Sequence, residues 1–377
     1  MKKINVAVVG LRFGGGFAGL YQYHPQVETV GVFDTDPAIT KQVADLFAPV
    51  KAYNSFEEIL ADKTIDAVHL VTPFPVHEEQ TVAVLKSGKH CACTVPMAMT
   101  LEGIQRIVDT VRETGKHYMM METTLYTYQF LYVQEMLRKG ELGKIQFFRG
   151  THYQDMVNWP DYWVGLPPMH YGTHAIAPMT VLSGSRICKV HCFGSGTMAE
   201  SLVKHYGNPY PVESALFAFE NGLKAEATRS LFETARTYQE GLNVYGSKAS
   251  FEWGFSDSDD PLVTVAIPPA EGKRGGTDQI QVVKLPDYLE TLPEELRPLA
   301  KSGTYYDPLN PQESLEKGFG GGHHGSHPHL VHEFVSSIIE DRKPWIDEIL
   351  GANITAAGIC AHESAMRDGE AVEIPRF

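Results

Sequence analysis

The sequence predicts an α/β fold that begins with a parallel sheet covered by helices. The first observation is that short apolar runs alternate with helix-like segments through the first third of the chain, as parallel strands and their crossover helices do. The second is a glycine-rich turn directly after the first run, with an aspartate closing the second. The apolar runs cover residues 4–9, 27–33, 67–71, 90–95 and 118–121, and the helix-like segments cover residues 37–47, 75–87 and 101–114.

Composition sets the class of protein. The 377 residues are 43% hydrophobic and 21% charged, as in an ordinary globular protein, and the formal net charge is −14. Because an acidic surface repels phosphates, neither nucleic acid nor an anionic membrane surface is expected as a partner. No apolar run is long enough to span a membrane and the five cysteines do not form a disulfide pattern, so we expect a cytoplasmic protein.

The turn after the first apolar run is a candidate phosphate-binding loop. Gly10 allows a tight turn, and Gly15 allows close helix packing and leaves amide N–H groups for a pyrophosphate. Arg12 stands where the middle glycine of the usual motif would be, and Phe13 follows it. The alternative is a glycine-rich turn that binds nothing.

Asp34 strengthens the nucleotide interpretation. It lies 24 positions after Gly10, at the end of the second apolar run, where a carboxylate accepts hydrogen bonds from a ribose. An aspartate there also repels a 2′-phosphate, which favours NAD over NADP. Asp36 is a competitor for the same role.

The rest of the chain predicts a second domain. We expect a dinucleotide-binding domain over residues 1–122 and a substrate domain over residues 123–377, with period-two strands and a hairpin at Asn221–Gly222. A stretch rich in Pro, Asp, Glu and Lys, about residues 257–318, is expected to be an irregular insertion.

Several segments together resemble the glucose-fructose oxidoreductase, inositol dehydrogenase and MocA (Gfo/Idh/MocA) family. They are the turn at residues 10–15, Asp34, Thr72-Pro73 with His77, residues 88–90, 140–145 and 246–250. The resemblance implies a Rossmann domain followed by an α/β domain with a large, open, mostly antiparallel sheet. It also implies NAD as the cofactor, held in part by Thr72, Pro73, His77 and Pro96, and a sugar or polyol as substrate.

Two departures from the family pattern point to a subset. Where the family has Glu-Lys-Pro, this chain has Thr94-Val95-Pro96, so the lysine that polarises the reacting hydroxyl is Val95. The family's D-x-G-x-H begins here with His170. Residues 95–100 and 171–178 are instead similar to the NAD-dependent glycosidase branch, such as the α-N-acetylgalactosaminidase type, with Tyr171 and His174 retained. Residues 322–327 are a weaker counterpart of that branch's late G-H-G-G-M-D.

The candidate site residues follow from these patterns. Tyr171 and His174 are three apart, which on a helix places a phenol and an imidazole on one face. His323 is a third catalytic candidate. The candidates for sugar binding are Trp159, Trp163, His170 and His327. The alternative for the tryptophans and histidines is a purely structural role, in which their rings pack against neighbouring side chains. The i,i+4 spacings of His170 with His174 and of His323 with His327 also suit a metal, but without a full ligand motif we expect none.

We therefore predict an NAD-dependent enzyme that acts on a sugar by hydride transfer at a ring carbon, C3. Redox-neutral glycoside cleavage through oxidation, elimination, hydration and re-reduction is the leading hypothesis. The rivals are a sugar dehydrogenase with net NADH formation and a non-enzymatic cofactor-binding sensor. An open sheet needs cover on its second face, so a homodimer or homotetramer is expected.

Overall fold

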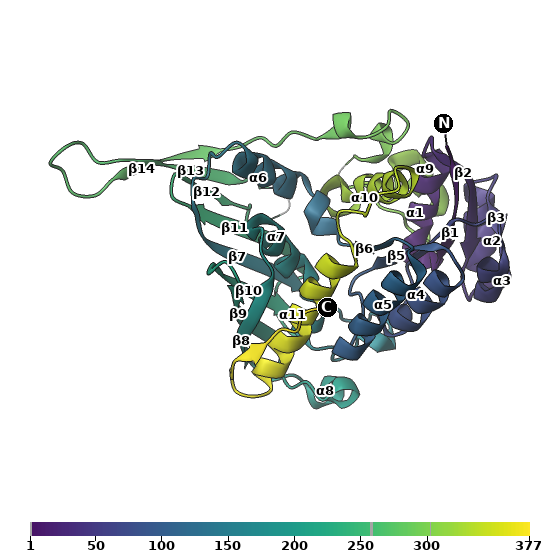
Figure 1. Ribbon diagram of the computed structural model, residues 1–377, viewed down its shortest axis with the longest axis horizontal. Coiled ribbons are helices and arrows are strands. Elements are labelled where there is room, and N and C mark those ends of the chain that lie inside the picture. Colours follow the sequence, from purple (N-terminus) through teal and green to yellow (C-terminus); the bar gives the residue numbers. More distant parts are fainter. Residues whose placement is uncertain (1, 257–258, 302) are drawn as a thin grey trace. The chain divides into compact units, whose positions relative to one another are not determined.

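The computed structural model describes residues 2–256, 259–301 and 303–377. The chain forms two compact units that are interleaved in sequence (Figure 1). The first unit combines the N-terminal residues up to 128 with residues 287–352, and the second combines residues 129–286 with residues 353–376. The segment 287–352, which we placed in the second domain, thus packs within the first unit.

The first unit contains a six-stranded parallel sheet with the order β3-β2-β1-β4-β5-β6. This confirms the predicted parallel fold. The predicted runs became strands, and the unpredicted β3 has only two residues, too few to show a pattern. The strands are β1 Ile4–Val9, β2 Val27–Phe33, β3 Lys51–Ala52, β4 Ala67–Leu70, β5 His90–Thr94 and β6 Tyr118–Met121.

Helix α5 is capped at both ends. Thr100 accepts a hydrogen bond from the Gly103 amide at the start, and Gly115 ends the helix in the left-handed conformation. The helices of the unit are α1 Leu11–Tyr23, α2 Pro37–Leu46, α3 Phe56–Ala61, α4 His77–Lys86, α5 Leu101–Thr114, α9 Pro311–Lys317 and α10 Gly322–Ile339. Four 3₁₀ turns accompany them in the described chain: η1 Phe74–Val76, η2 Thr123–Tyr126, η5 Leu289–Thr291 and η6 Arg297–Leu299.

The second unit contains a nine-stranded sheet with the order β14-β13-β12-β11-β7-β10-β9-β8-β15. Its neighbours are antiparallel except for β10 and β7, so the expectation of a large, mostly antiparallel sheet is confirmed. The strands are β7 Ile145–Gln154, β8 Ile187–Ser195, β9 Val212–Phe219, β10 Lys224–Ser230, β11 Tyr238–Gly246, β12 Ala249–Glu252, β13 Leu262–Ile267, β14 Thr277–Val282 and β15 Val372–Glu373.

Helix α7 packs against the middle of this sheet, over β7, β10 and β11. The approach is close, since a Cβ on Gly150 of β7 would lie 2.3 Å from the Ala175 carbonyl oxygen. The other helical elements here are α6 Tyr128–Arg138, η3 Asp161–Trp163, η4 Pro168–Tyr171, α7 Thr173–Ser183, α8 Glu200–Tyr206 and α11 Glu348–Ala365, whose first residues belong to the first unit.

The expected irregular insertion is partly regular. Residues 262–267 and 277–282 pair as the antiparallel hairpin β13–β14, which extends from the end of the sheet (Figure 1). The consecutive β-branched residues Val263, Thr264 and Val265 in the first of these strands carried the signal, but the surrounding polar composition hid it. A short helix, α9, also lies inside the stretch that we expected to be irregular.

The histidine-rich segment, residues 318–332, includes the start of helix α10. Helix α10 begins at Gly322, and residues 323–325 turn through left-handed backbone before the regular helix continues. Pro328 is tolerated because it falls in the first regular turn, where an amide N–H has no intrahelical partner.

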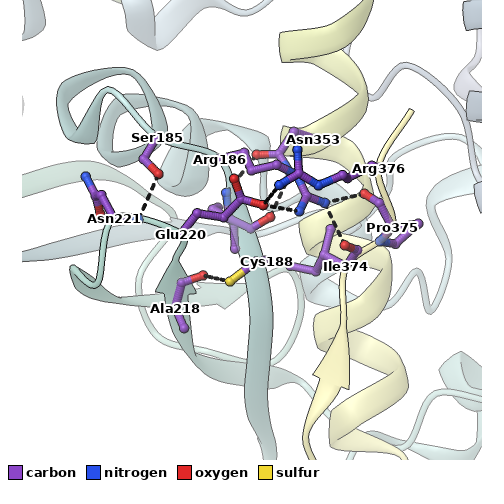
Figure 2. A network of polar contacts seen from close by, with 11 residues as sticks. Ser185, Arg186, Cys188, Ala218, Glu220, Asn221, Asn353, Ile374, Pro375 and Arg376 are labelled. Atoms are coloured by element: carbon purple, nitrogen blue, oxygen red, sulfur yellow. Dashed lines mark hydrogen bonds and ion pairs between the residues drawn. The ribbon is translucent and has the colours of Figure 1, made fainter.

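The C-terminal segment is fastened to the edge of the second sheet by a polar network around Arg186 (Figure 2). The Arg186 guanidinium contacts Glu220 at 3.0 Å and donates to the Ile374 carbonyl oxygen at 2.6 Å. The Asn353 side chain exchanges two hydrogen bonds with the Ile187 backbone, at 3.0 and 2.9 Å.

None of the helices in the described part of the chain has the length and apolar character needed to cross a membrane.

Candidate functional site

The glycine turn between β1 and α1 is fixed by its backbone. Gly10 has φ +87°, and a Cβ there would lie 2.5 Å from the Val71 carbonyl oxygen at the end of β4. The Gly10 amide donates to the Phe33 carbonyl oxygen at 2.9 Å. The turn therefore joins the ends of three neighbouring strands, which is where parallel sheets of this type bind ligands.

The three following glycines have different neighbours. A Cβ on Gly14 would lie 3.1 Å from the Val71 side chain, so Gly14 is the residue that lets α1 approach the strands. A Cβ on Gly15 would lie 2.3 Å from the Tyr306 ring. The structure therefore gives Gly15 a role that we did not predict, which is to make room for Tyr306 from a distant part of the same unit.

The next two predicted residues lie on the exposed side of the turn. Phe13 is 49% exposed. Arg12 is also exposed and lies 3.5 Å from the Asp36 carboxylate. A cation and an aromatic ring at the start of α1 are compatible with a pyrophosphate there.

Asp34 connects the turn to the end of β2. Its carboxylate accepts from the Leu11 amide at 2.7 Å and from the Asp36 amide at 2.9 Å. Its competitor Asp36 caps α2 by accepting from the Ala38 amide at 3.0 Å. A carboxylate has about four acceptor positions, so Asp34 keeps acceptor capacity for a ribose.

A hollow of about 620 Å³ lies beside Asp34. Its lining combines apolar and polar side chains, including Pro37, Tyr53 and Asn54. This space is of the size of a small-molecule site. The tight turn, the carboxylate and the hollow together fit the adenosine half of a dinucleotide.

His77 holds two other predicted cofactor segments together. Its Nδ1 lies 2.8 Å from the Pro96 carbonyl oxygen, and its Nε2 lies 2.8 Å from the Thr72 carbonyl oxygen. Burial lowers the pKa of His77, and the two carbonyl contacts oppose that shift. His77 thus positions the turns at Thr72-Pro73 and Val95-Pro96.

The structure brings the histidine-rich segment next to the glycine turn. The His327 ring is buried, with its centroid 5.6 Å from that of Phe13 and 4.7 Å from that of Phe17. His323 lies 5.7 Å from His327 between ring centroids and has φ +45°, which is unusual for a residue with a side chain. Because the backbone at His323 is left-handed, the pair does not have the regular i,i+4 geometry that we considered for a metal.

Tyr171 and His174 meet in the second unit, although not on one helix. Tyr171 ends the turn η4 and His174 lies in the first turn of α7. Their ring centroids are 5.5 Å apart, edge to face. The two side chains are neighbours, as their spacing predicted. They do not lie on one helix, because Gly172 separates η4 from α7.

Arg229 and Trp163 surround the Tyr171 ring. The Arg229 guanidinium carbon lies 5.5 Å from the ring centroid, and its Nε donates to the Tyr171 carbonyl oxygen at 2.9 Å. Burial lowers the pKa of Arg229 to about 10, opposed by Tyr171 and other neighbours. Trp163 is buried 4.8 Å from Tyr171 between ring centroids, whereas Trp159 is 46% exposed and so is the better placed of the two tryptophans to contact a ligand.

The His170 ring contacts His362 rather than Tyr171 or His174. Its ring lies 5.1 Å from that of His362, and His362 Nδ1 lies 2.6 Å from a buried Glu213 oxygen. Burial lowers the pKa of His170 to about 3, with a contribution from His362. The buried groups beside His174 are instead His152 and Glu240.

Sequence reasoning missed Arg229, His152 and Glu240. Each is a polar residue at a buried position of a strand, with exposures of 0%, 1% and 1%. Alternation along β7, β10 and β11 could have marked them as inward-facing polar residues, which are uncommon without a partner.

These features define a class, namely a nucleotide-binding parallel domain combined with an open-sheet domain that carries a polar and aromatic cluster. The oxidoreductase-family model for an NAD-binding Rossmann fold matches residues 4–122, and the Gfo/Idh/MocA C-terminal domain model matches residues 130–252. The chain belongs to the Gfo/Idh/MocA family of oxidoreductases, and NAD is the cofactor of its N-terminal domain.

Curated relatives of the chain include proteins that are named as glycosidases. A glycosyl hydrolase family 109 protein of Porphyromonas gingivalis is 28% identical over 174 residues, which cover 43% of this chain and 37% of that protein. An α-N-acetylgalactosaminidase of Shewanella oneidensis is 26% identical over 263 residues, covering 63% and 56%. The chain thus spans about half the length of such relatives.

Solved structures share the fold over nearly the full chain. A levoglucosan dehydrogenase in complex with NADH and levoglucosan has a TM-score of 0.78 at 18% identity, with full coverage of both chains. A myo-inositol 2-dehydrogenase from Lactobacillus plantarum has a TM-score of 0.74 at 17% identity, covering 99% of this chain and 100% of that one.

Proposed function

We propose that this protein is an NAD-dependent enzyme that cleaves a glycoside without net oxidation. The observation that carries the proposal is the pairing of Tyr171 with His174, 5.5 Å apart between ring centroids, in a chain that has Val95 in place of the usual lysine. The glycosidase names of curated relatives support the same substrate class.

NAD, when bound, would supply the hydride acceptor for oxidation at a ring carbon, C3, and its reduced form the donor for the final reduction. In the oxidation, His174 accepts the proton of the C3 hydroxyl. A ketone at C3 makes the neighbouring C2 proton acidic, and the Tyr171 phenolate removes it. The bond from C1 to the leaving group then breaks, water adds at C1, and the same groups act in reverse.

A tyrosine serves as a base near neutrality only when a positive charge stabilises its phenolate. Arg229 supplies one from within the same unit, because its guanidinium carbon lies 5.5 Å from the Tyr171 ring centroid. Its place is fixed by hydrogen bonds to the Tyr171 and His152 carbonyl oxygens, at 2.9 and 3.0 Å. On this proposal, Trp159 contributes an apolar ring for the sugar, and His323 is the third catalytic group.

The test is a panel of aryl glycosides incubated with and without NAD, in ordinary and in deuterated water. Release of the aryl group that requires NAD, leaves no net NADH and places deuterium at C2 is the expected result. Steady NADH formation from free sugars would instead establish the dehydrogenase, which the sugar dehydrogenases among the structural neighbours favour. Binding of NAD without turnover of either kind would leave a sensor.

The assembly is proposed to be a homodimer or homotetramer. Large apolar side chains are exposed on β8 and β9, among them Phe193 at 57% and Leu216 at 46%. Burial of such a surface by a second copy would be favourable. Light scattering should report a multiple of the 41.8 kDa chain mass, and a particle of that single mass would contradict the proposal.

A further inference from the structure

Three buried side chains with metal-ligating atoms converge in the second unit. His152 lies on β7, and Glu240 is its direct partner across the ladder with β11. His174 comes from α7, which packs on the same two strands. The tertiary structure therefore joins residues from three elements that no sequence spacing connects.

The geometry of the three groups suits one small cation. Their ligand atoms all lie within 4.8 Å of one another, and the side chains are 1%, 5% and 1% exposed for His152, His174 and Glu240. Around a tetrahedral zinc ion with nitrogen and oxygen ligands, ligand atoms are separated by about 3.4 Å. Small rotations about the side-chain bonds would close the remaining difference.

The surroundings resemble the outer shell of a metal site. The Tyr238 hydroxyl donates to Glu240 Oε1 at 2.6 Å, which orients the carboxylate. The His152 ring is held edge-on between His174 and Tyr238, with centroids 4.8 and 5.4 Å away. A buried carboxylate is costly unless a positive partner or hydrogen bonds compensate it. Arg229 and the Tyr238 hydroxyl already interact with Glu240, and a divalent cation would add a direct bond to the carboxylate.

We propose that His152, His174 and Glu240 bind a divalent first-row cation of the zinc type. Two imidazoles and one carboxylate are a ligand set that such ions prefer. Three protein ligands leave one position of a tetrahedral ion for water or a hydroxyl oxygen. This site is distinct from the two i,i+4 histidine pairs of the sequence, and it shares only His174 with them.

The ion also has a consequence that rests on the proposed function. A hydroxyl bound to a divalent cation loses its proton more readily. The sugar hydroxyl would then release its proton to water, and His174 would act on it by holding the ion. In this way the ion would polarise the hydroxyl, which is the role of the family's lysine at the position where this chain has Val95.

The first experiment measures metal content and Co²⁺ binding on the full chain, purified without a histidine tag and stripped with a chelator. The expected result is one Zn²⁺ per chain after reconstitution, and a Co²⁺ complex with the intense visible absorption of tetrahedral coordination that Zn²⁺ displaces. Retained zinc well below one ion per chain, together with only weak octahedral Co²⁺ absorption, would overturn the proposal.

Matched variants locate the site. Glu240→Gln keeps the shape of the side chain and should abolish the tetrahedral Co²⁺ spectrum, whereas His205→Gln, at an exposed position on α8 of the same unit, should leave it unchanged. Tyr238→Phe removes only the hydrogen bond to Glu240 and should weaken Zn²⁺ affinity by about 10–100-fold. This variant tests the proposal even if Glu240→Gln does not fold. Equal Co²⁺ spectra and affinities in all three variants would contradict it.

The failure of this inference is distinguishable from the failure of the proposed function. Absence of stoichiometric metal binding in the unaltered protein, with NAD-dependent aryl release and C2 deuteration present, would remove the ion and leave the glycosidase. Stoichiometric metal that depends on Glu240, in a protein that cleaves no glycoside, would retain the ion and remove the glycosidase.

Discussion

The glycine turn of the first unit and the Tyr171 cluster of the second unit are built in different ways. The turn depends on backbone conformation, since Gly10 combines φ +87° with a contact that leaves no space for a Cβ. The cluster depends on side chains from β7, β10, β11, η4 and α7, held in register by the sheet. A backbone-defined site is therefore sensitive to any added atom, whereas a side-chain-defined site is sensitive to chemistry at constant shape.

The largest expected effect is on the chemistry of the second unit. Tyr171→Phe keeps the ring and removes the proposed base, so elimination should slow by about 10²–10⁴-fold while oxidation of the sugar still occurs. Stopped-flow absorbance should show a single burst of NADH that does not decay. Tyr210→Phe, a tyrosine of the same unit outside the cluster, is the control, and equal rates in the two variants would remove Tyr171 from the mechanism.

The next largest effect is on stability and tests the backbone requirement at Gly10. Gly10→Ala should destabilise the protein by about 2–5 kcal/mol, because it adds both left-handed strain and a steric clash. Gly88→Ala is a matched control, since Gly88 has φ +86° and nothing within 4 Å of a built Cβ. It should cost only about 1–2 kcal/mol in denaturant unfolding. Equal losses would mean that the contact with Val71 yields without cost.

A smaller effect is expected for the nucleotide. Asp34→Ala should weaken NAD binding by about 1–3 kcal/mol and relax the preference for NAD over NADP, because the ribose hydroxyls lose their acceptor. Calorimetry with both nucleotides measures this. Asp36→Ala should affect the cap of α2 and leave that preference intact. The reverse outcome would assign the ribose to Asp36.

The effect that is smallest at neutral pH concerns the acid stability of the first unit, and it grows as the pH falls. Burial lowers the pKa of His69 from 6.5 to about 3, so the folded state holds it neutral while the unfolded chain binds a proton below pH 6.5. Its contribution is fully present above pH 6.5 and is lost as the pH falls toward 3, by about 1.4 kcal/mol per pH unit. His69→Leu should make the decline of unfolding free energy with acid shallower. His205→Leu, at an exposed site, should follow the wild type, and parallel curves for all three proteins would contradict the assignment.

The sequence by itself determined the parallel domain, the position of Gly10 and the residue at the end of the second strand. Strand runs, glycines and an aspartate at fixed spacing reflect local backbone requirements, and these survive without knowledge of distant contacts. Tyr171 and His174 were identified from the resemblance to the glycosidase branch, and their spacing of three residues predicted that they would be neighbours. It gave the wrong local structure for them, since a single glycine interrupts the helix between the two.

Only the tertiary structure decided which residues surround that pair. Arg229, His152 and Glu240 reach Tyr171 and His174 through strand register and through the packing of α7 on β7, β10 and β11. The register between two strands is a long-range property, because the same alternation of buried and exposed residues is compatible with more than one pairing. The same holds for Gly15, whose need to be glycine comes from the ring of Tyr306, 291 positions further along the chain. Contacts of this kind leave no local pattern in the sequence, because the residues involved become neighbours only when the chain has folded.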